Sequence, residues 1–360
     1  GKKYKVTRIT GYTPVKYTFD NVSEKKQAEG YGKNGMEVVV GGKYFACSHY
    51  QTDLFQKSGY GKKVHMLSKG RYRKVVLPST LTRIGDGAFS GNTSIREIEF
   101  APKYKNLTIG RDAFLCDYLE KIDYPEGTKE IEDFASSASI VSIPRSVKKI
   151  GDGVLSACHK VTIAKKNPRY RLKQDVVYTK NGKTLVAATS NVKKDFVLPA
   201  KVTKIRPYAF ETISINSVKL SKHITDIAPG TFSLCSELTK VTGMKKVQRI
   251  GYGAFERCRK LRSLDNLFSL KKIDRAAFWM AYGKLDITLP SGIEEIDDYA
   301  FSGYTFVTPV NIKISGSKKF YSKDGCFIKM EGDKKLLLTM NLKCLRRKVC
   351  KVPEGVTDIV

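Results

Sequence analysis

Cysteine and histidine are the residue types in this chain that most often act as nucleophiles or metal ligands, so their spacing is considered first. The chain has eight cysteines: Cys47, Cys116, Cys158, Cys235, Cys258, Cys326, Cys344 and Cys350. Three of them follow a Phe or Leu by three residues within copies of one short phrase, and other copies have Asn, Ala or Tyr there. A position that accepts such different side chains is a packing position, and free Cys packs as a small hydrophobic residue. We therefore expect structural, buried thiols.

Disulfides stay open at two places, and metal or catalytic sites are not expected. Cys235 and Cys258 would lie about 5 Å apart in adjacent repeats, and Cys344 and Cys350 either pair or pack within a hairpin. There is no C-x-x-C pair, and the histidines lack a second ligand pair: His49, His65, His159 and His223. The motifs G-x-S-x-G, H-E-x-x-H and G-x-x-x-x-G-K-[ST] are absent. The sequence predicts no metal, no cofactor and no enzyme activity; an enzyme hidden in the insertions would need a Cys, His and carboxylate cluster created by folding.

The charge of the chain points to a possible class of partner. Lys and Arg number 65 against 35 Asp and Glu, a net charge of +30. Such a field attracts polyanions such as nucleic acid, acidic glycans or an anionic membrane surface. The alternative is a solubilising, Lys-rich surface, because the basic residues are spread along the chain.

Two stretches are candidate binding sites. The first is "FWMAYG", where Trp279, Met280 and Tyr282 occupy positions that other copies of the phrase fill mostly with polar residues. We predict that these side chains point outward, as interface residues do; the alternative is a local repacking that buries Trp279.

The second candidate is a cationic band beside this stretch. It consists of Arg249, Lys272, Arg257, Arg259 and Lys260. If the repeats stack, Arg249 neighbours Lys272, and like charges that close are unfavourable without a counterion. This predicts an anionic ligand; the alternative is a solvated edge.

A repeat must position these residues. Taking the Ile before "GDGAF"-like phrases as a marker gives Ile84, Ile109, Ile131, Ile150, Ile205, Ile227, Ile250, Ile273 and Ile296. The spacings are 25, 22, 19, 55, 22, 23, 23 and 23 residues. The unit reads I-x-x-x-A-F-x-x-C-x-x-L-x-x-I-x-L-P-x-x-V-x-x. A period of this length is typical of a solenoid.

The unit predicts short strands that stack. In "LEKIDYP" the residues Leu119, Ile122 and Tyr124 alternate with charged residues, as one buried face of a strand requires. Val147 and Ile150 would face the same interior from the opposite wall, and the Phe of each "AF" would stack on that of the next coil. The glycines of "GDGAF" would form the corner of the coil through positive φ. The expected fold is mainly β: a right-handed leucine-rich-repeat solenoid with a parallel β ladder, short irregular or 3-10 turns and β-hairpin insertions.

The insertions divide the chain. In the longest gap, "VVYT" and "TLVAA" flank Asn181-Gly182, a hairpin signal, and "SKDGCFIKM" begins a counterpart. We predict an N-terminal region with a hairpin-like cap at 1–70, repeats at 71–164, a hairpin insertion at 165–195, repeats at 196–315, and a hairpin insertion followed by the start of a further repeat at 316–360.

The phrases "IGDGAF", "IGYGAF", "FSLCSEL" and "LPSGIEEI" closely resemble the BspA-like, or Treponema pallidum-type, subgroup of leucine-rich repeats. This resemblance covers roughly residues 70–360. It implies a secreted or outer-surface bacterial protein that acts in adhesion or recognition, with host matrix proteins among the targets. The family offers no shared catalytic residues or binding motif to transfer, and the excess of Lys and Arg departs from its expected charge.

Two functions follow from the sequence. The first is a non-catalytic surface or secreted protein that binds a host or bacterial surface protein or a glycan through its repeat faces, including the mixed polar ladder face. The alternative is a protein that binds an acidic polymer through its charge. No apolar run reaches the 18 or so residues of a membrane span. The chain begins at Gly1, which we interpret as an expression remnant, and we expect a secretion signal to have been removed.

Overall fold

The computed structural model describes residues 8–9, 73–92, 94–116, 118–156, 158–281, 284–301, 310–340 and 351–359. It divides into two units, Gly1–Leu172 and Lys173–Val360, each of which is considered by itself. Apart from β1 (Arg8–Ile9), the predicted N-terminal region 1–70 lies outside the described residues, as do Cys47, Cys344 and Cys350.

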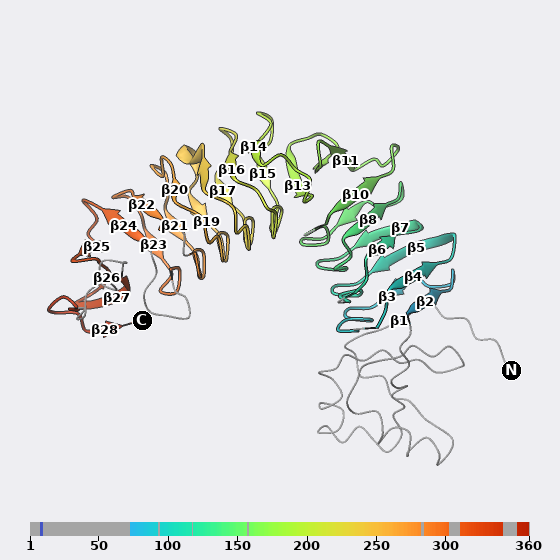
Figure 1. Cartoon of the computed structure of the whole chain (residues 1–360), viewed down its shortest axis with the longest axis horizontal. Helices are drawn as coiled ribbons and strands as arrows, with labels where there is room; N and C mark the ends of the chain where they lie inside the picture. Colours follow the sequence, from blue (N-terminus) through green and yellow to red (C-terminus); the bar gives the residue numbers. More distant parts are fainter. Residues whose placement is uncertain are drawn as a thin grey trace, which may run out of the picture. The chain divides into compact units, whose positions relative to one another are not determined.

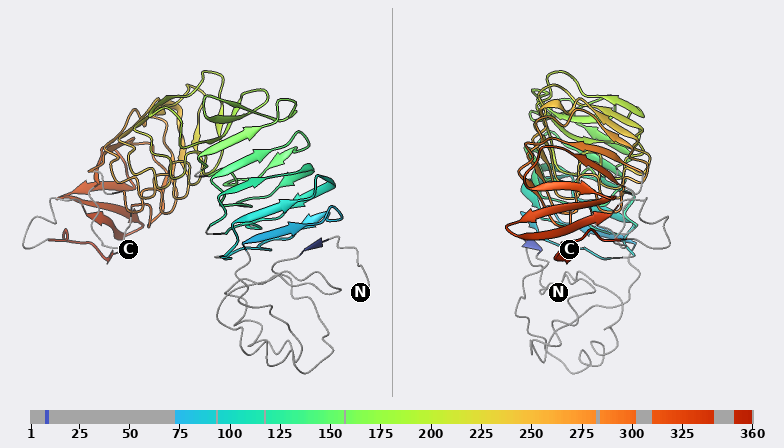
Figure 2. Two further views of the ribbon diagram at one scale, coloured as in Figure 1. Left: turned by 45° about the vertical axis from the view of Figure 1, so that its right-hand side comes forward. Right: turned by 90° about the vertical axis from the view of Figure 1, so that its left-hand side faces the viewer.

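The first unit is built from parallel strands that recur once per repeat (Figure 1). One wall consists of β2 (Lys74–Leu77) and β4 (Glu97–Phe100), then β6 (Lys121–Asp123), β8 (Ile140–Ile143) and β10 (Lys160–Ile163). The other wall is a five-stranded sheet of β1, β3 (Arg83–Ile84), β5 (Lys103–Ile109), β7 (Glu126–Ile131) and β9 (Lys149–Ile150). In the left view of Figure 2 the blue-to-green strands of this unit lie side by side as arrows of the same direction.

The second unit repeats this design. Its main ladder is a six-stranded parallel sheet: β14 (Asp195–Val197), β16 (Ser217–Lys219), β18 (Lys240–Thr242), β20 (Ser263–Leu264), β22 (Asp286–Leu289) and β24 (Asn311–Ile314). Its second ladder contains β17 (Asp226–Ile227), β19 (Arg249–Ile250), β21 (Lys272–Ile273) and β23 (Glu295–Ile296). Each main-ladder strand buries its middle residue, such as Val218 or Val241, and exposes polar neighbours. The described residues contain one 3-10 helix, η1 (Met244–Lys246), and no α-helix. The predicted β solenoid is confirmed.

A column of phenylalanines runs through the interior of the second unit. The rings of Phe210, Phe232, Phe255, Phe278 and Phe301 stack with successive centroid separations of 5.3, 5.4, 5.3 and 5.1 Å. All five side chains are fully buried. The predicted coil-to-coil stacking is therefore confirmed, and it joins the repeats into one core because a repeat of this length buries too little surface to fold alone.

The two glycines of the "GDG" phrase serve different purposes. The second one has the predicted positive φ, 61° at Gly87 and 72° at Gly153. The first is needed because backbones approach closely: a Cβ at Gly151 would lie 2.3 Å from the Asp133 nitrogen. The prediction that both turn the corner by positive φ thus holds for the second glycine alone.

The predicted hairpin insertion is present. Strands β12 (Val176–Thr179) and β13 (Thr184–Ala188) pair antiparallel on either side of Asn181-Gly182, and β13 continues in parallel onto β15 (Lys204–Ile205). The counterpart consists of β25 (Phe320–Lys323), β26 (Cys326–Glu331) and β27 (Lys334–Met340), with β28 (Asp358–Ile359) beside β27. Strand β11 (Tyr170–Lys173) lies at the junction of the two units.

Both insertions begin with a side chain that organises a turn. Asn167 is buried, donates to the carbonyls of Pro144 and Val147 at 2.9 and 3.1 Å, and accepts from the nitrogens of Arg169 and Tyr170. In the second insertion the Ser317 hydroxyl accepts from two backbone nitrogens in the same way, both at 3.2 Å. The buried amide of Asn167 is fully satisfied, which explains how a polar residue is accommodated in the core.

The buried thiols are part of this architecture. Cys158, Cys235 and Cys258 are free and buried, and each Sγ donates to a backbone carbonyl of the preceding coil, at 3.4, 2.9 and 3.0 Å. Burial raises the pKa of the Cys158 thiol to about 12 and also raises the pKa of Cys235 and Cys258. Thiols held in the neutral form are poor nucleophiles and metal ligands. The predicted structural role is confirmed, and Cys235 and Cys258 do not form a disulfide.

Alkaline pH is expected to destabilise the protein through these thiols. An unfolded Cys ionises near pH 8.5, whereas the folded pKa values are higher, so the unfolded state loses protons first. Stability is complete below about pH 8.5 and falls as the pH rises towards the folded pKa of about 12 for Cys158, by up to about 1.4 kcal/mol per pH unit per thiol. Urea unfolding at about pH 8 and about pH 10 measures this. The control replaces all three with alanine, which Ala281 shows the position accepts; equal pH dependence in both proteins would contradict the account.

Candidate functional site

The predicted aromatic site lies in turns that follow the second ladder. After β19, β21 and β23 the chain makes corner turns, and each turn is bonded to that of the next coil. The Arg257 nitrogen donates to the Trp279 carbonyl at 2.7 Å, and the Gly253 nitrogen donates to the Arg275 carbonyl at 3.2 Å. Adjacent repeats therefore bring side chains 22 residues apart in sequence onto one surface.

Trp279 and Arg257, predicted separately as an aromatic site and a cationic band, form one contact. The Arg257 guanidinium carbon lies 5.0 Å from the centroid of the Trp279 ring, which is half-buried. This is a cation–π geometry. The Glu256 carboxylate lies 3.8 Å from Arg257 Nε, and burial raises the pKa of Glu256 against the opposing effect of Arg257.

The other two members of the aromatic prediction do not join this contact. Met280 was expected to point outward, but only 8% of its surface is exposed. It occupies a turn position with φ 55°, shared with Leu234 and Arg257, and its flexible, apolar thioether side chain suits an interior gap. That expectation was wrong. Tyr282 lies outside the described residues.

The argument for an anionic ligand on the cationic band does not hold for Arg249 and Lys272. The two residues are neighbours, as predicted. However, Arg249 donates to Asp274 Oδ2 at 2.9 and 2.6 Å, and Lys272 lies 2.7 Å from Glu295 Oε1. Asp274 raises the pKa of Arg249 by accepting these hydrogen bonds. Carboxylates of the same coils therefore relieve the repulsion, and no ligand is needed to explain it.

The remaining two cations of the band differ from each other. Lys260 is paired with Glu237, at 2.7 Å. Arg259 is exposed and has no ion pair among the described residues. Of the whole predicted band, Arg257 and Arg259 thus remain available to a partner.

The structure adds three side chains that sequence reasoning missed. The Arg275 guanidinium lies over the ring of Tyr299 at 4.6 Å, a second stack one coil further on. Tyr299 is 45% exposed and Tyr252, in the preceding turn, is 51% exposed. These residues stand two or three positions after a marker Ile, where the first unit has Asp86, Asp133 and Asp152. Comparing those positions among repeats would have revealed them. We define the aromatic ridge as Tyr252, Arg257, Arg275, Trp279 and Tyr299.

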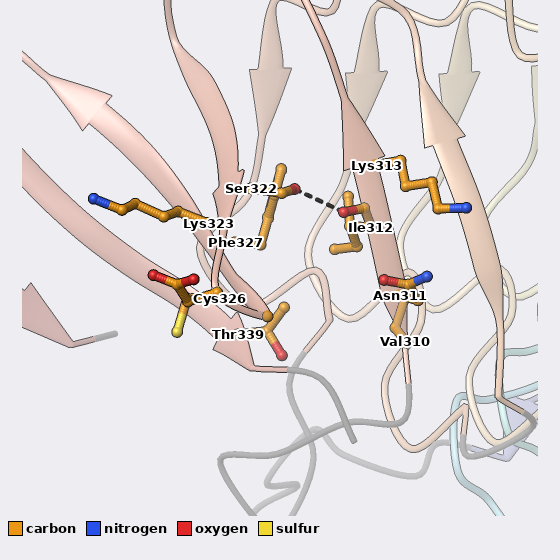
Figure 3. A pocket seen from close by; sticks show the side chains of 11 residues that line it. Val310, Asn311, Ile312, Lys313, Ser322, Lys323, Cys326, Phe327 and Thr339 are labelled. Carbon is orange, nitrogen blue, oxygen red and sulfur yellow. Dashed lines mark hydrogen bonds between the residues drawn. The ribbon is translucent and has the colours of Figure 1, made fainter. Parts of the chain in front are cut away.

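The structure also contains a small cavity beside β24 and the second hairpin (Figure 3). Its volume is about 160 Å³, and Asn311, Lys313, Ser322, Lys323 and Thr339 are among the residues that line it. The Ser322 hydroxyl donates to the Ile312 carbonyl at 2.7 Å. Pockets for small-molecule ligands usually measure about 300–1,000 Å³, so this cavity is too small for a cofactor of nucleotide size.

Metal-binding and membrane-spanning features were also considered for the described part of the chain. Within it, no group of three or more His, Cys, Asp or Glu side chains is placed to hold a metal ion. None of its helices is long and apolar enough to cross a bilayer.

Comparison with solved structures supports the fold. A leucine rich cell surface protein from Faecalibacterium prausnitzii A2-165 is 24% identical with a TM-score of 0.52, and the match covers 68% of this chain and 79% of that one. A leucine-rich repeat protein from Eubacterium ventriosum ATCC 27560 is 19% identical (TM-score 0.48, covering 65% and 77%). The pneumococcal vaccine antigen PcpA is 18% identical (TM-score 0.44, covering 68% of each).

Comparison at the level of sequence identifies the family. The sequences of curated proteins give no match. The family model described as "BspA type Leucine rich repeat region (6 copies)" matches residues 65–176, 188–283 and 283–341, well over half of the chain. Together with the repeat phrases and the parallel ladders, this match shows that the chain belongs to the BspA-type leucine-rich repeat family.

Proposed function

We propose that this chain is a non-catalytic recognition or adhesion protein of a bacterial surface, and that it binds a protein partner through the aromatic ridge. The observation that carries the proposal is the stack of Arg257 on Trp279 at the surface of adjacent coils. The ridge falls within the second block of repeats, residues 196–315, of the division that we propose for the chain.

The composition of the ridge suits a protein interface. Trp, Tyr and Arg are the residues most enriched among those that dominate binding energy. Large aromatic side chains also supply contact area with few rotatable bonds. The ridge has all three types in three successive coils, and Tyr252 and Tyr299 keep about half of their surface exposed.

The ridge is also ordered before a partner arrives. Arg257 and Arg275 each lie over an aromatic ring of the next coil, so part of the entropy cost of fixing these long side chains is met by folding. Rigid side chains lose less entropy on binding, which increases affinity. The turns beneath them are held by backbone hydrogen bonds between coils.

The solved structure with the same fold is described as a cell surface protein, and the resemblance stated from the sequence implies extracellular matrix proteins as partners. A panel of purified matrix proteins is therefore the appropriate probe. We expect Trp279→Ala and Arg257→Ala to weaken binding about 30-fold, since hot-spot residues contribute about 2 kcal/mol or more. Biolayer interferometry measures this.

The first unit offers a matched control. There Arg96 lies over the ring of Tyr118 at 4.0 Å, the same kind of stack, and Tyr118 is 56% exposed. Tyr118→Ala should leave the affinity unchanged. Equal loss in Tyr118→Ala and Trp279→Ala would show that the ridge has no special role, and failure of every matrix protein to bind would refute this class of partner.

A further inference from the structure

A second surface of the same unit is formed by the turns that follow the main ladder. Three successive coils make the same turn here. The backbone nitrogen of the last residue donates to the carbonyl three residues earlier: Val202 to Pro199 at 2.9 Å, Ile224 to Ser221 at 3.2 Å, and Val247 to Met244 at 2.9 Å. Val202, Ile224 and Val247 are buried. The two central residues of each turn are therefore held in equivalent positions.

Those central positions are basic in these three coils. They hold Ala200-Lys201, Lys222-His223 and Lys245-Lys246, all but Ala200 charged or titratable and all exposed. The next two turns of the unit hold Phe268-Ser269 and Ser291-Gly292 instead. In the first unit the corresponding turn at Lys165-Lys166 is the one described turn with two lysines. We define the lysine row as Lys201, Lys222, His223, Lys245 and Lys246.

The register of the strands brings the lysine row together. Val197 of β14 pairs with Lys219 of β16, which pairs with Thr242 of β18. Counting four residues from each leads to Lys201, His223 and Lys246. Adjacent strands of a sheet are about 4.8 Å apart, so the row places basic side chains at intervals of about 5 Å.

The lysine row lacks the counterions that neutralise the second ladder. In the described parts of the chain none of its four lysines forms an ion pair, whereas Arg249, Lys260 and Lys272 all do. The nearest carboxylates by register have other partners: Asp265 accepts from the Met244 nitrogen, and Asp226 accepts from the Thr225 hydroxyl. Unpaired like charges at this spacing favour binding of an anion.

An exposed aromatic ring ends the row. Phe268 occupies the turn position next to Lys245 in the following coil and is 70% exposed. The face of an aromatic ring attracts positively polarised hydrogens, such as the C–H groups on the face of a sugar. Single-stranded nucleic acid, in contrast, is usually held by aromatic side chains that stack on successive bases, and this row has one ring.

We propose that the lysine row and Phe268 form a binding site for an acidic glycan, with sulfate or carboxylate groups on the lysines and a sugar ring on Phe268. This site is distinct in residues and ligand class from the aromatic ridge, so either proposal can fail without the other. The site also gives part of the net charge of +30 a specific location.

Heparin affinity chromatography with a salt gradient, followed by titration with a heparin oligosaccharide, tests the site. We expect the triple variant Lys222→Ala, Lys245→Ala, Lys246→Ala to elute at lower salt and to bind the oligosaccharide about 10- to 100-fold more weakly, with a shallower dependence of affinity on salt because fewer counterions are released. Phe268→Ala should weaken binding with the salt dependence unchanged.

A charge-matched control separates the site from the overall charge. Lys180, Lys183 and Lys318 lie on the hairpin insertions, are exposed, and form no ion pair in the described structure. Their triple alanine variant should elute with the unchanged protein. Equal elution of the two triple variants would overturn the proposal, and so would a lysine-row variant that loses binding to single-stranded DNA while keeping its affinity for heparin.

Discussion

Replacing Phe255 with alanine is expected to lower the free energy of unfolding of the second unit by about 3–5 kcal/mol. Phe255 is fully buried in the middle of the phenylalanine column, with Phe232 and Phe278 stacked on either side at 5.4 and 5.3 Å. The substitution leaves a cavity that the rigid ladders on both walls cannot close. It also interrupts the contact between neighbouring repeats on which the stability of a solenoid depends.

Two further variants make this prediction specific. Phe255→Leu should cost less than about 1.5 kcal/mol, because Leu155 fills the same position, buried, in the first unit. Phe268→Ala makes the same chemical change at an exposed site and should change stability by less than about 0.5 kcal/mol. Urea unfolding followed by the emission of the sole Trp, residue 279, reports on this unit. A loss for Phe255→Ala no greater than for Phe268→Ala would contradict the stacked core.

The second large effect is expected for Gly127→Ala in the first unit. Gly127 has φ 92°, and a Cβ there would lie 1.8 Å from the Tyr104 carbonyl oxygen. The backbone of β5 would have to move away from β7, at a cost of about 3 kcal/mol or more, since strained φ and a steric clash add together.

Gly91→Ala isolates the contribution of φ alone. Gly91 has φ 71° but nothing within 4 Å of the added Cβ, so its cost should be about 1 kcal/mol. Hydrogen–deuterium exchange of peptides from Lys103–Ile109 and Glu126–Ile131 measures the local effect. Exchange in these peptides that is no faster for Gly127→Ala than for Gly91→Ala would show that the close approach is not required.

The fold could be predicted because the repeat states the same physical requirements many times. Buried positions such as Ile122 and Val147, the Phe column and the thiols at Cys235 and Cys258 all follow from one pattern, and the structure agrees with it. Agreement between local pattern and global fold is what makes a sequence legible.

The candidate site was less predictable because it depends on contacts between coils. The register of Arg249 and Lys272 was correct, but their charge balance depends on Asp274 and Glu295. Those partners become visible only when side chains of neighbouring coils are placed together. Met280 differs for a local reason: the positive φ of its turn position, 55°, gives it a direction that hydrophobicity alone does not indicate.

Two surfaces of the second unit therefore divide the function that the sequence assigned to one region. The aromatic ridge lies on the turns after the second ladder, and its neighbouring cations are largely neutralised by carboxylates. The lysine row lies on the turns after the main ladder and is not neutralised within the described structure. Protein recognition and attraction of acidic polymers thus need not compete for the same residues.

The measurement that tests the central claim most directly uses the fact that Trp279 is the one Trp of the chain. Labelling with 5-fluorotryptophan gives a single ¹⁹F resonance that reports on the aromatic ridge. Adding an unlabelled matrix protein that binds the chain should shift or broaden this resonance in the unchanged protein and in Tyr118→Ala. A resonance that stays unchanged while the partner is fully bound would place the interface elsewhere and contradict the account.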